Sequence, residues 1–242
     1  HEKQPLALSS QDIQVPSVKS LDRFRLNDSA EQLRNTVTNI GKSAAPAGDL
    51  LGFVQTTTGS ALSASEQIGS ASGQYKTGIA YPDSKLAQKF KTVAQLIDAG
   101  LKTRIYYVTL DGFDTHSRQA AAHEPLLREL SGALDAFVRD LDEHGHGDRV
   151  LTMSFSEFGR RLQENASEGT DHGAAAPAFF AGNRVNSGLI GKHPSLHDLQ
   201  DGDVKFHTDF RQVYATVLDQ WLGVESARIL GGKFLPVSAL QG

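Results

Sequence analysis

The stretch "IYYVTLDGFDTH" (Ile105–His116) begins as an apolar run and ends in two carboxylates and an imidazole. Its β-branched and aromatic residues predict a buried strand over 104–110, closed by a turn at Asp111 and Gly112. Asp114 and His116 then follow at the carboxyl end of that strand, where open α/β sheets place their sites. We therefore expect a strand that carries ligands at its end. A polar turn that merely closes the strand is the alternative.

The segments on both sides of this stretch predict an α/β protein. Strand, helix and strand in succession form a βαβ unit, whose strands are parallel and whose crossover is right-handed. We expect a parallel-sheet layer with flanking helices over 101–242, preceded by an N-terminal arm and a mainly helical segment over 1–100. The expected helices lie at 27–40, 49–72, 82–100 and 208–223, and a further helix is expected through the apolar repeat from Leu127 to Leu141, stopping in "HGHG" (144–147). Two further strands are expected in "RVLTMSF" (149–155) and "PAFFAG" (177–182).

The composition excludes several classes of function. The chain has 242 residues and a formal net charge of -4, so no basic surface for nucleic acid or for an anionic membrane is expected. It has no cysteine, which excludes disulfides, thiolate ligands and cysteine nucleophiles. No apolar run approaches the length of a transmembrane helix. Any anion that the chain binds must be held by a local site.

Three polar clusters are expected at one edge of the predicted sheet. They are "DGFDTH" (111–116), "SEFGRRLQEN" (156–165) and "GTDHG" (169–173), the last in a loop that enters the third strand. Because parallel strands bring their carboxyl ends to the same edge, side chains of these clusters should converge. Oxygen and imidazole ligands suit Zn²⁺, Mn²⁺ or Fe²⁺ better than Ca²⁺ or Mg²⁺, which stay open. The predicted metal ligands are Asp114, His116, Glu157, Asp171 and His172. Loop histidines that are hydrogen-bonded without any metal are the alternative.

Other polar residues near these clusters have less specific roles. Arg160 is predicted to bind a substrate anion through its guanidinium, whereas Arg161 is expected to pair with a surface acid. His123 stands close to the start of a helix, where it is a further candidate ligand or a partner of one. His144 and His146 lie at a helix end and are interpreted as part of a solvated turn.

From about residue 75 onward, the order of these motifs resembles a known family. Together they resemble the C-terminal part of the DUF1501 family, a largely uncharacterised bacterial group that is similar to the alkaline phosphatase and sulfatase superfamily of metal-dependent hydrolases. The motifs are "YYVTLDGFDTHSRQAAAHEPLLRELSGALDAF" (106–137), "VLTMSFSEFGRR" (150–161), "NASEGTDHGAAAPAFFAG" (165–182) and "TDFRQVYATVLDQWLG" (208–223).

The resemblance implies roles for particular residues. Asp114 and His116 resemble the Asp and the His that bind one metal ion in the superfamily. His172 resembles the metal-binding histidine that precedes the final sheet strand of the superfamily. Glu157 and Phe158 stand where an Asp-His pair is usual, so a single or altered metal site is implied instead of a two-metal site. An early strand and nucleophile of the superfamily are not found before residue 75. The chain is therefore expected to be an incomplete, C-terminal part of a longer protein, with the missing N-terminal segment as its partner.

The function implied by the resemblance is metal-dependent hydrolysis of small anionic phosphate or sulfate esters. Arg160 would steady the anionic group, and the protein would be secreted or periplasmic. A non-catalytic, secreted module of the same fold, stabilised by metal or serving in binding, is the alternative, and a metal-free binding partner is a further one.

Overall fold

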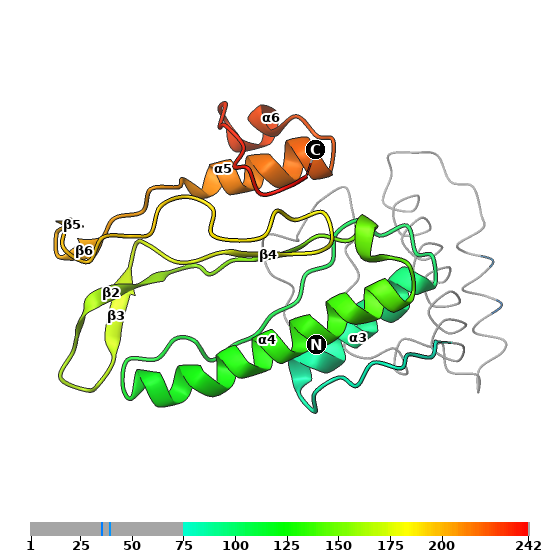
Figure 1. The fold of residues 1–242 in the computed structure, drawn as a ribbon, viewed down its shortest axis with the longest axis horizontal. Coiled ribbons are helices and arrows are strands. Elements are labelled where there is room, and N and C mark those ends of the chain that lie inside the picture. Colours follow the sequence, from blue (N-terminus) through cyan, green and yellow to red (C-terminus); the bar gives the residue numbers. More distant parts are fainter. Residues whose placement is uncertain (1–34, 36–38, 40–74, 242) are drawn as a thin grey trace. The chain divides into compact units, whose positions relative to one another are not determined.

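The computed structural model describes residues 35, 39 and 75–241 (Figure 1). These residues divide into two compact units, one with residues 75–80 and 88–108 and the other with residues 81–87 and 109–241. The predicted arm and the predicted helix at 49–72 lie outside the described residues. Within the predicted helix at 27–40, only Asn35 and Asn39 are described, and both are helical.

The two long helices confirm the helical periodicity of the sequence. Helix α3 (Lys85–Asp98) ends just before Gly100, whose φ of 73° is the left-handed conformation that favours glycine after a helix. Helix α4 (Gln119–Glu143) has 25 residues and buries Phe137 and Leu141 on one face. The first residue of the apolar repeat, Leu127, is 49% exposed, so the buried face of α4 is confined to its second half.

One buried residue of α4 is a carboxylate. Asp140 is fully buried, and its Oδ2 accepts a hydrogen bond of 2.6 Å from the hydroxyl of Tyr81. The Nδ1 atom of His144, one turn later, lies 3.3 Å from the Oδ1 atom of Asp140. The bond from Tyr81 offsets part of the cost of removing the carboxylate from water, whereas Nδ1 of His144 is hydrogen-bonded to the backbone carbonyl of Asp140.

The strands of the described region form three two-stranded antiparallel sheets. Strand β1 (Thr152–Ser154) pairs with β4 (Phe179–Ala181), and β2 (Gly159–Glu164) pairs with β3 (Thr170–Gly173). The short strands β5 (Leu199–Gln200) and β6 (Asp203–Val204) pair with each other. The β2–β3 hairpin therefore lies between the two strands of the β1–β4 pair in the sequence (Figure 1). Helices and strands are mixed, as expected of an α/β chain in general.

The parallel pairing that we expected for these strands is wrong. A parallel neighbour needs a long crossover, usually a helix, between the two strands. Between β1 and β4 the chain instead turns back on itself through the β2–β3 hairpin, so β4 returns antiparallel to β1. The segments "SEFGRRLQEN" and "GTDHG", expected as loops, supply the two strands of this hairpin.

The strand expected over 104–110 is also absent from the described region. These residues are neither helical nor paired in a sheet, and Ile105 is 65% exposed. A β-branched and aromatic run becomes a strand only when a neighbouring strand completes its ladder of hydrogen bonds. None of the described strands pairs with this run.

The C-terminal helix is where the sequence predicts it. Helix α5 (Phe210–Ala215) begins with a capping box formed by Asp209 and Gln212, and continues as the π-helical segment η4 (Thr216–Trp221). A 3-10 turn, η3 (Gly147–Arg149), follows α4, and α6 (Ser226–Leu230) comes last.

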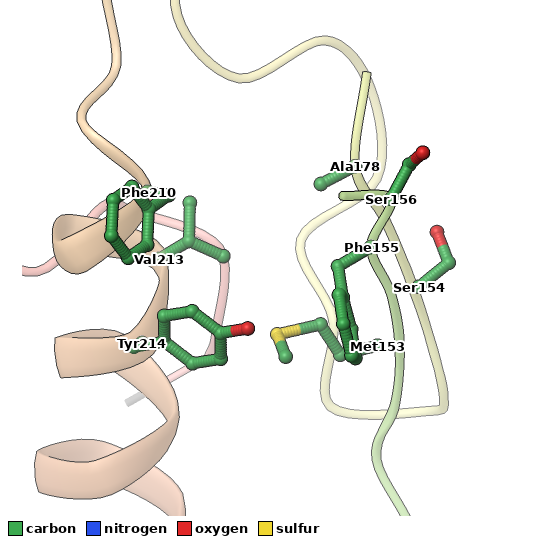
Figure 2. Close-up of a pocket in the computed structure, with 8 residues that line it drawn as sticks. All are labelled: Met153, Ser154, Phe155, Ser156, Ala178, Phe210, Val213 and Tyr214. Carbon is green, nitrogen blue, oxygen red and sulfur yellow. The ribbon is translucent and has the colours of Figure 1, made fainter. Parts of the chain in front are cut away.

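The apolar face of α5 opens onto a pocket. Figure 2 shows Phe210, Val213 and Tyr214 of α5 facing Met153 and Phe155, which come from β1 and the residue after it. Phe210 is 66% exposed, so this face is less buried than the periodicity suggested. Of the helices that the structure describes, none combines the length and the apolar character needed to cross a bilayer.

Candidate metal centre

Three of the predicted ligands meet in the structure. One ligand atom from each of Asp114, His116 and His172 lies within 4.8 Å of the other two. Asp114 and His172 are 58 positions apart in the chain, yet the Nε2 atom of His172 is 2.8 Å from the Oδ1 atom of Asp114. Among the residues that the structure describes, this is the group with metal-ligating geometry.

The distances inside the group are close to those that a metal requires. Oδ1 of Asp114 also lies 3.1 Å from Nε2 of His116, and the two imidazole rings have centroids 4.9 Å apart. Two ligand atoms on a tetrahedral Zn²⁺ are about 3.4 Å apart. Oδ1 of Asp114 and each Nε2 atom therefore need to separate by about 0.3–0.6 Å to share a tetrahedral ion. In the metal-free chain, the two Nε2–H groups donate to the shared carboxylate oxygen.

The group is open to solvent on one side. The side chains of Asp114, His116 and His172 are 65%, 52% and 42% exposed. Three protein ligands with room for water or substrate are typical of catalytic zinc sites, whereas structural sites are closed by a fourth protein ligand. The donor set of two imidazoles and one carboxylate also suits Mn²⁺ or Fe²⁺.

The other two predicted ligands lie outside this group of three. Asp171 approaches it, since its Oδ1 atom is 3.5 Å from Nδ1 of His116. A carboxylate on the second ring nitrogen orients a ligating histidine and makes it more basic, so Asp171 has the position of an outer partner. Glu157 is exposed in the segment after β1. Its assignment as a ligand stays a prediction.

The β2–β3 hairpin, not a sheet edge, brings His172 to Asp114. The turn of the hairpin contacts the start of α4, where the backbone N–H groups of Arg118 and Gln119 donate to the carbonyls of Ser167 and Glu168, each at 2.9 Å. These bonds satisfy donors that a helix N-terminus otherwise leaves free. On the same side, the Nδ2 atom of Asn165 donates to the carbonyl of His116 at 3.0 Å.

Strand β3 has a further connection to α4. Oε1 of Gln119 accepts hydrogen bonds of 2.8 Å from both the backbone N–H and the hydroxyl of Thr170. Thr170 is two residues before His172, so this contact holds the strand beside the helix start. The sequence did contain a signal for the hairpin, because "NASEG" (165–169) is a run of turn-forming residues between two strand-like segments.

Substituting Gly169 with alanine is expected to weaken metal binding. A Cβ at this position would lie 2.6 Å from the backbone carbonyl of His116, so the hairpin turn or the ligand segment must move. Overpacking of this kind costs about 1–3 kcal/mol. We expect calorimetric titration with Zn²⁺ to give a larger Kd for Gly169→Ala. Gly232→Ala is a matched control because its Cβ would meet Phe234 at an ordinary 3.6 Å, and equal Kd values for both variants would contradict the expectation.

Phe158 is a part of the site that the search for polar ligands missed. Its ring stacks on the imidazole of His172, with centroids 3.8 Å apart and planes 7° from parallel. In the sequence, the family resemblance identified Phe158 only as the residue that stands where a histidine is expected. In the structure it covers one face of His172 and so restricts the orientation of that ring.

The two histidines lower the pKa of Asp114. The largest cause is the hydrogen bond from His172; desolvation opposes it, and His116 contributes a weaker hydrogen bond. A lowered pKa in the folded chain means that this interaction stabilises the protein above the usual value of 3.8 and is lost as the pH falls through the lower, folded value.

When the carboxyl ¹³C signal of Asp114 is followed by NMR during a pH titration of the metal-free chain, the midpoint of the titration should therefore lie below pH 3.8. His172→Ala should raise that midpoint toward the usual value, whereas His193→Ala should leave it in place because His193 is bonded to the carbonyl of Pro194 in another loop. A midpoint that His172→Ala does not raise would count against the hydrogen bond.

Comparison with known proteins supports the resemblance seen in the motifs. The family model of DUF1501, described as a protein of unknown function, matches residues 4–232. The match thus begins far earlier than residue 75, where the resemblance was expected to start. No curated protein and no solved structure matches the chain. Because the family model covers nearly the whole sequence, the chain belongs to the DUF1501 family.

Proposed function

We propose that this chain supplies the metal site of a metal-dependent hydrolase of phosphate or sulfate esters. The observation that carries the proposal is the convergence of Asp114, His116 and His172, whose ligand atoms lie within 4.8 Å of one another. Two imidazoles and one carboxylate are a donor set typical of metal ions that catalyse hydrolysis. The exposure of the three side chains leaves space for a substrate.

Each residue of the group has a defined task in this proposal. Asp114, His116 and His172 would hold the cation, and the carboxylate of Asp171, 3.5 Å from Nδ1 of His116, would keep that ring oriented. Bound there, a divalent cation supplies Lewis-acid polarisation of an ester oxygen. Phe158 excludes water from one face of His172 by stacking on it.

The relation of the family to the alkaline phosphatase and sulfatase superfamily belongs to the same proposal. So does export from the cytoplasm. Their support is the resemblance of the "DGFDTH" and "GTDHG" motifs.

A second candidate is a non-catalytic module that metal stabilises. Two observations favour it: Phe158, an apolar residue where the resemblance expects a further ligating histidine, stacks on His172, and the guanidinium of Arg160 already donates to protein acceptors. A module of this kind would bind the metal without turning over an ester.

Hydrolysis assays with the metal-loaded full chain separate the two candidates. The chain, supplied with Zn²⁺ or Mn²⁺, is incubated with 4-nitrophenyl phosphate and with 4-nitrophenyl sulfate, and nitrophenolate release is followed. If the chain is a hydrolase, it releases nitrophenolate. Chelation and His172→Ala should abolish this release, whereas His193→Ala should leave it unchanged. Stoichiometric metal without release would favour the module, and a chain without affinity for metal would contradict both candidates.

A further inference from the structure

Arg160 contacts both of the chain segments that supply metal ligands. Its Nη1 donates to the carbonyl of Thr170 at 2.6 Å, and its Nη2 donates to the carbonyl of Phe113. The same Nη2 is 3.4 Å from the hydroxyl of Thr115. Phe113 and Thr115 flank Asp114 in the sequence, and Thr170 precedes His172 by two residues in β3.

We propose that Arg160 is a positioning residue of the metal centre, which bridges the segment of Asp114 and His116 to the strand of His172. The inference rests on the proposed metal binding and adds to it a residue that touches neither metal nor substrate. Arg160 lies directly opposite His172 in the β2–β3 register. From this position one guanidinium spans the gap between the two segments.

The planar guanidinium is the group that this task requires. Its nitrogens form a rigid fork, so two acceptors on different segments are held in a defined relation. A lysine ammonium is a single point charge on a flexible stem, and it cannot reproduce both bonds in the same way. The fork is also supported from the side, because Cζ of Arg160 lies over the ring of Phe158, 5.1 Å from its centroid.

His123 strengthens the same arrangement from helix α4. Its Nε2 atom lies 2.9 Å from Oγ1 of Thr115 and 3.3 Å from the carbonyl oxygen of Phe113. The residues on both sides of Asp114, through the backbone carbonyl of Phe113 and the side-chain hydroxyl of Thr115, are therefore in contact with Arg160 from the hairpin and with His123 from the helix. These contacts hold the residues next to Asp114, whereas its carboxylate is contacted by His116 and His172.

The role differs from the anion binding that the sequence suggested for Arg160, and metal affinity distinguishes the two roles. A cation that serves only to attract an anion repels a nearby metal ion, so its removal leaves metal binding unchanged or strengthens it. Removal of a positioning residue weakens metal binding, since the ligands lose their relative placement. Loss of outer partners of metal ligands typically costs about 10–100-fold in affinity.

The test measures Co²⁺ binding to the full chain and to three variants, Arg160→Met, Arg160→Lys and Arg161→Met. Arg161 is the matched control, because its Nε atom pairs with Asp203 at 2.9 Å, apart from the ligand segments. Equilibrium dialysis gives the Kd, and the visible absorption of bound Co²⁺ reports the geometry of its ligands. Circular dichroism and thermal melting of the metal-free variants show whether each one folds.

We expect Arg160→Met to raise the Kd about 10–100-fold and to change the Co²⁺ spectrum, and Arg161→Met to do neither. Arg160→Lys, the milder substitution, should also weaken binding. The proposal is overturned if Arg160→Met binds Co²⁺ with unchanged or higher affinity. It is also overturned if Arg160→Lys has the same Co²⁺ affinity and the same spectrum as the unsubstituted chain. Absence of Co²⁺ binding by the unsubstituted chain would instead contradict the proposed metal centre itself.

Discussion

Replacing His172 with alanine is expected to lower the affinity of the chain for Zn²⁺ by more than about 100-fold. The loss of an outer partner typically costs about 10–100-fold, and His172 is proposed as a ligand itself. Its Nε2 atom is 2.8 Å from Oδ1 of Asp114, so its removal leaves a two-residue site. His116→Ala should also lower the affinity, because the Nε2 atom of His116 lies 3.1 Å from the same oxygen.

Elemental analysis by inductively coupled plasma mass spectrometry, before and after exhaustive chelation, measures the metal content of each variant. Competition with a chromogenic chelator gives the Kd. His193→Ala is the control, since His193 contacts the carbonyl of Pro194 and is not part of the ligand group. Metal content that is the same in His116→Ala, His172→Ala and the unsubstituted chain would rule out this centre.

Adding metal is expected to stabilise the folded chain substantially. At a free Zn²⁺ concentration of 100 times the Kd, binding to the folded state alone contributes about 2.7 kcal/mol to the free energy of unfolding. For a unit of this size the melting temperature should rise by about 5–10 °C. The physical reason is that Asp114 and His172 come from distant parts of the chain, so the ion links segments that unfolding separates.

Differential scanning calorimetry with Zn²⁺ and with a chelator measures this stabilisation. His172→Ala is expected to melt at the same temperature under both conditions, because it lacks the complete ligand group. A melting temperature of the unsubstituted chain that does not respond to Zn²⁺ would favour the metal-free binding partner. A response retained in His172→Ala would place the metal somewhere else in the chain.

The candidate ligands could be predicted from the sequence because their chemistry is local. Asp114 and His116 follow an apolar run, and Asp171 and His172 stand between glycines. Carboxylates and imidazoles in such clusters point to a divalent metal whatever fold surrounds them. Of the five residues expected to converge, Asp114, His116 and His172 lie together in the structure, whereas Glu157 and Asp171 lie outside that group. The reason given for the convergence, a shared edge of a parallel sheet, was wrong, and metal binding by these residues stays a prediction.

The pairing of strands could not be predicted from the same patterns. The apolar residues of β1 and β4 show that each is a strand, but periodicity does not say which strand lies beside which. The intervening hairpin decides the direction of β4, and its turn is stabilised by contacts with the start of α4. Likewise, the run over 104–110 has strong β propensity and yet forms no strand in the described region, because propensity alone supplies no pairing partner.

The sequence by itself determined the long helices, the terminal helix and which residue types could bind a metal. Helices depend on hydrogen bonds and side-chain repeats within one segment, so a local pattern is sufficient to predict them. Only the tertiary structure decided that Arg160 bridges Phe113 and Thr170, that Phe158 stacks on His172, and that the hairpin brings His172 to Asp114. Contacts of this kind join residues far apart in the chain, and their geometry exists only after folding has placed the segments together.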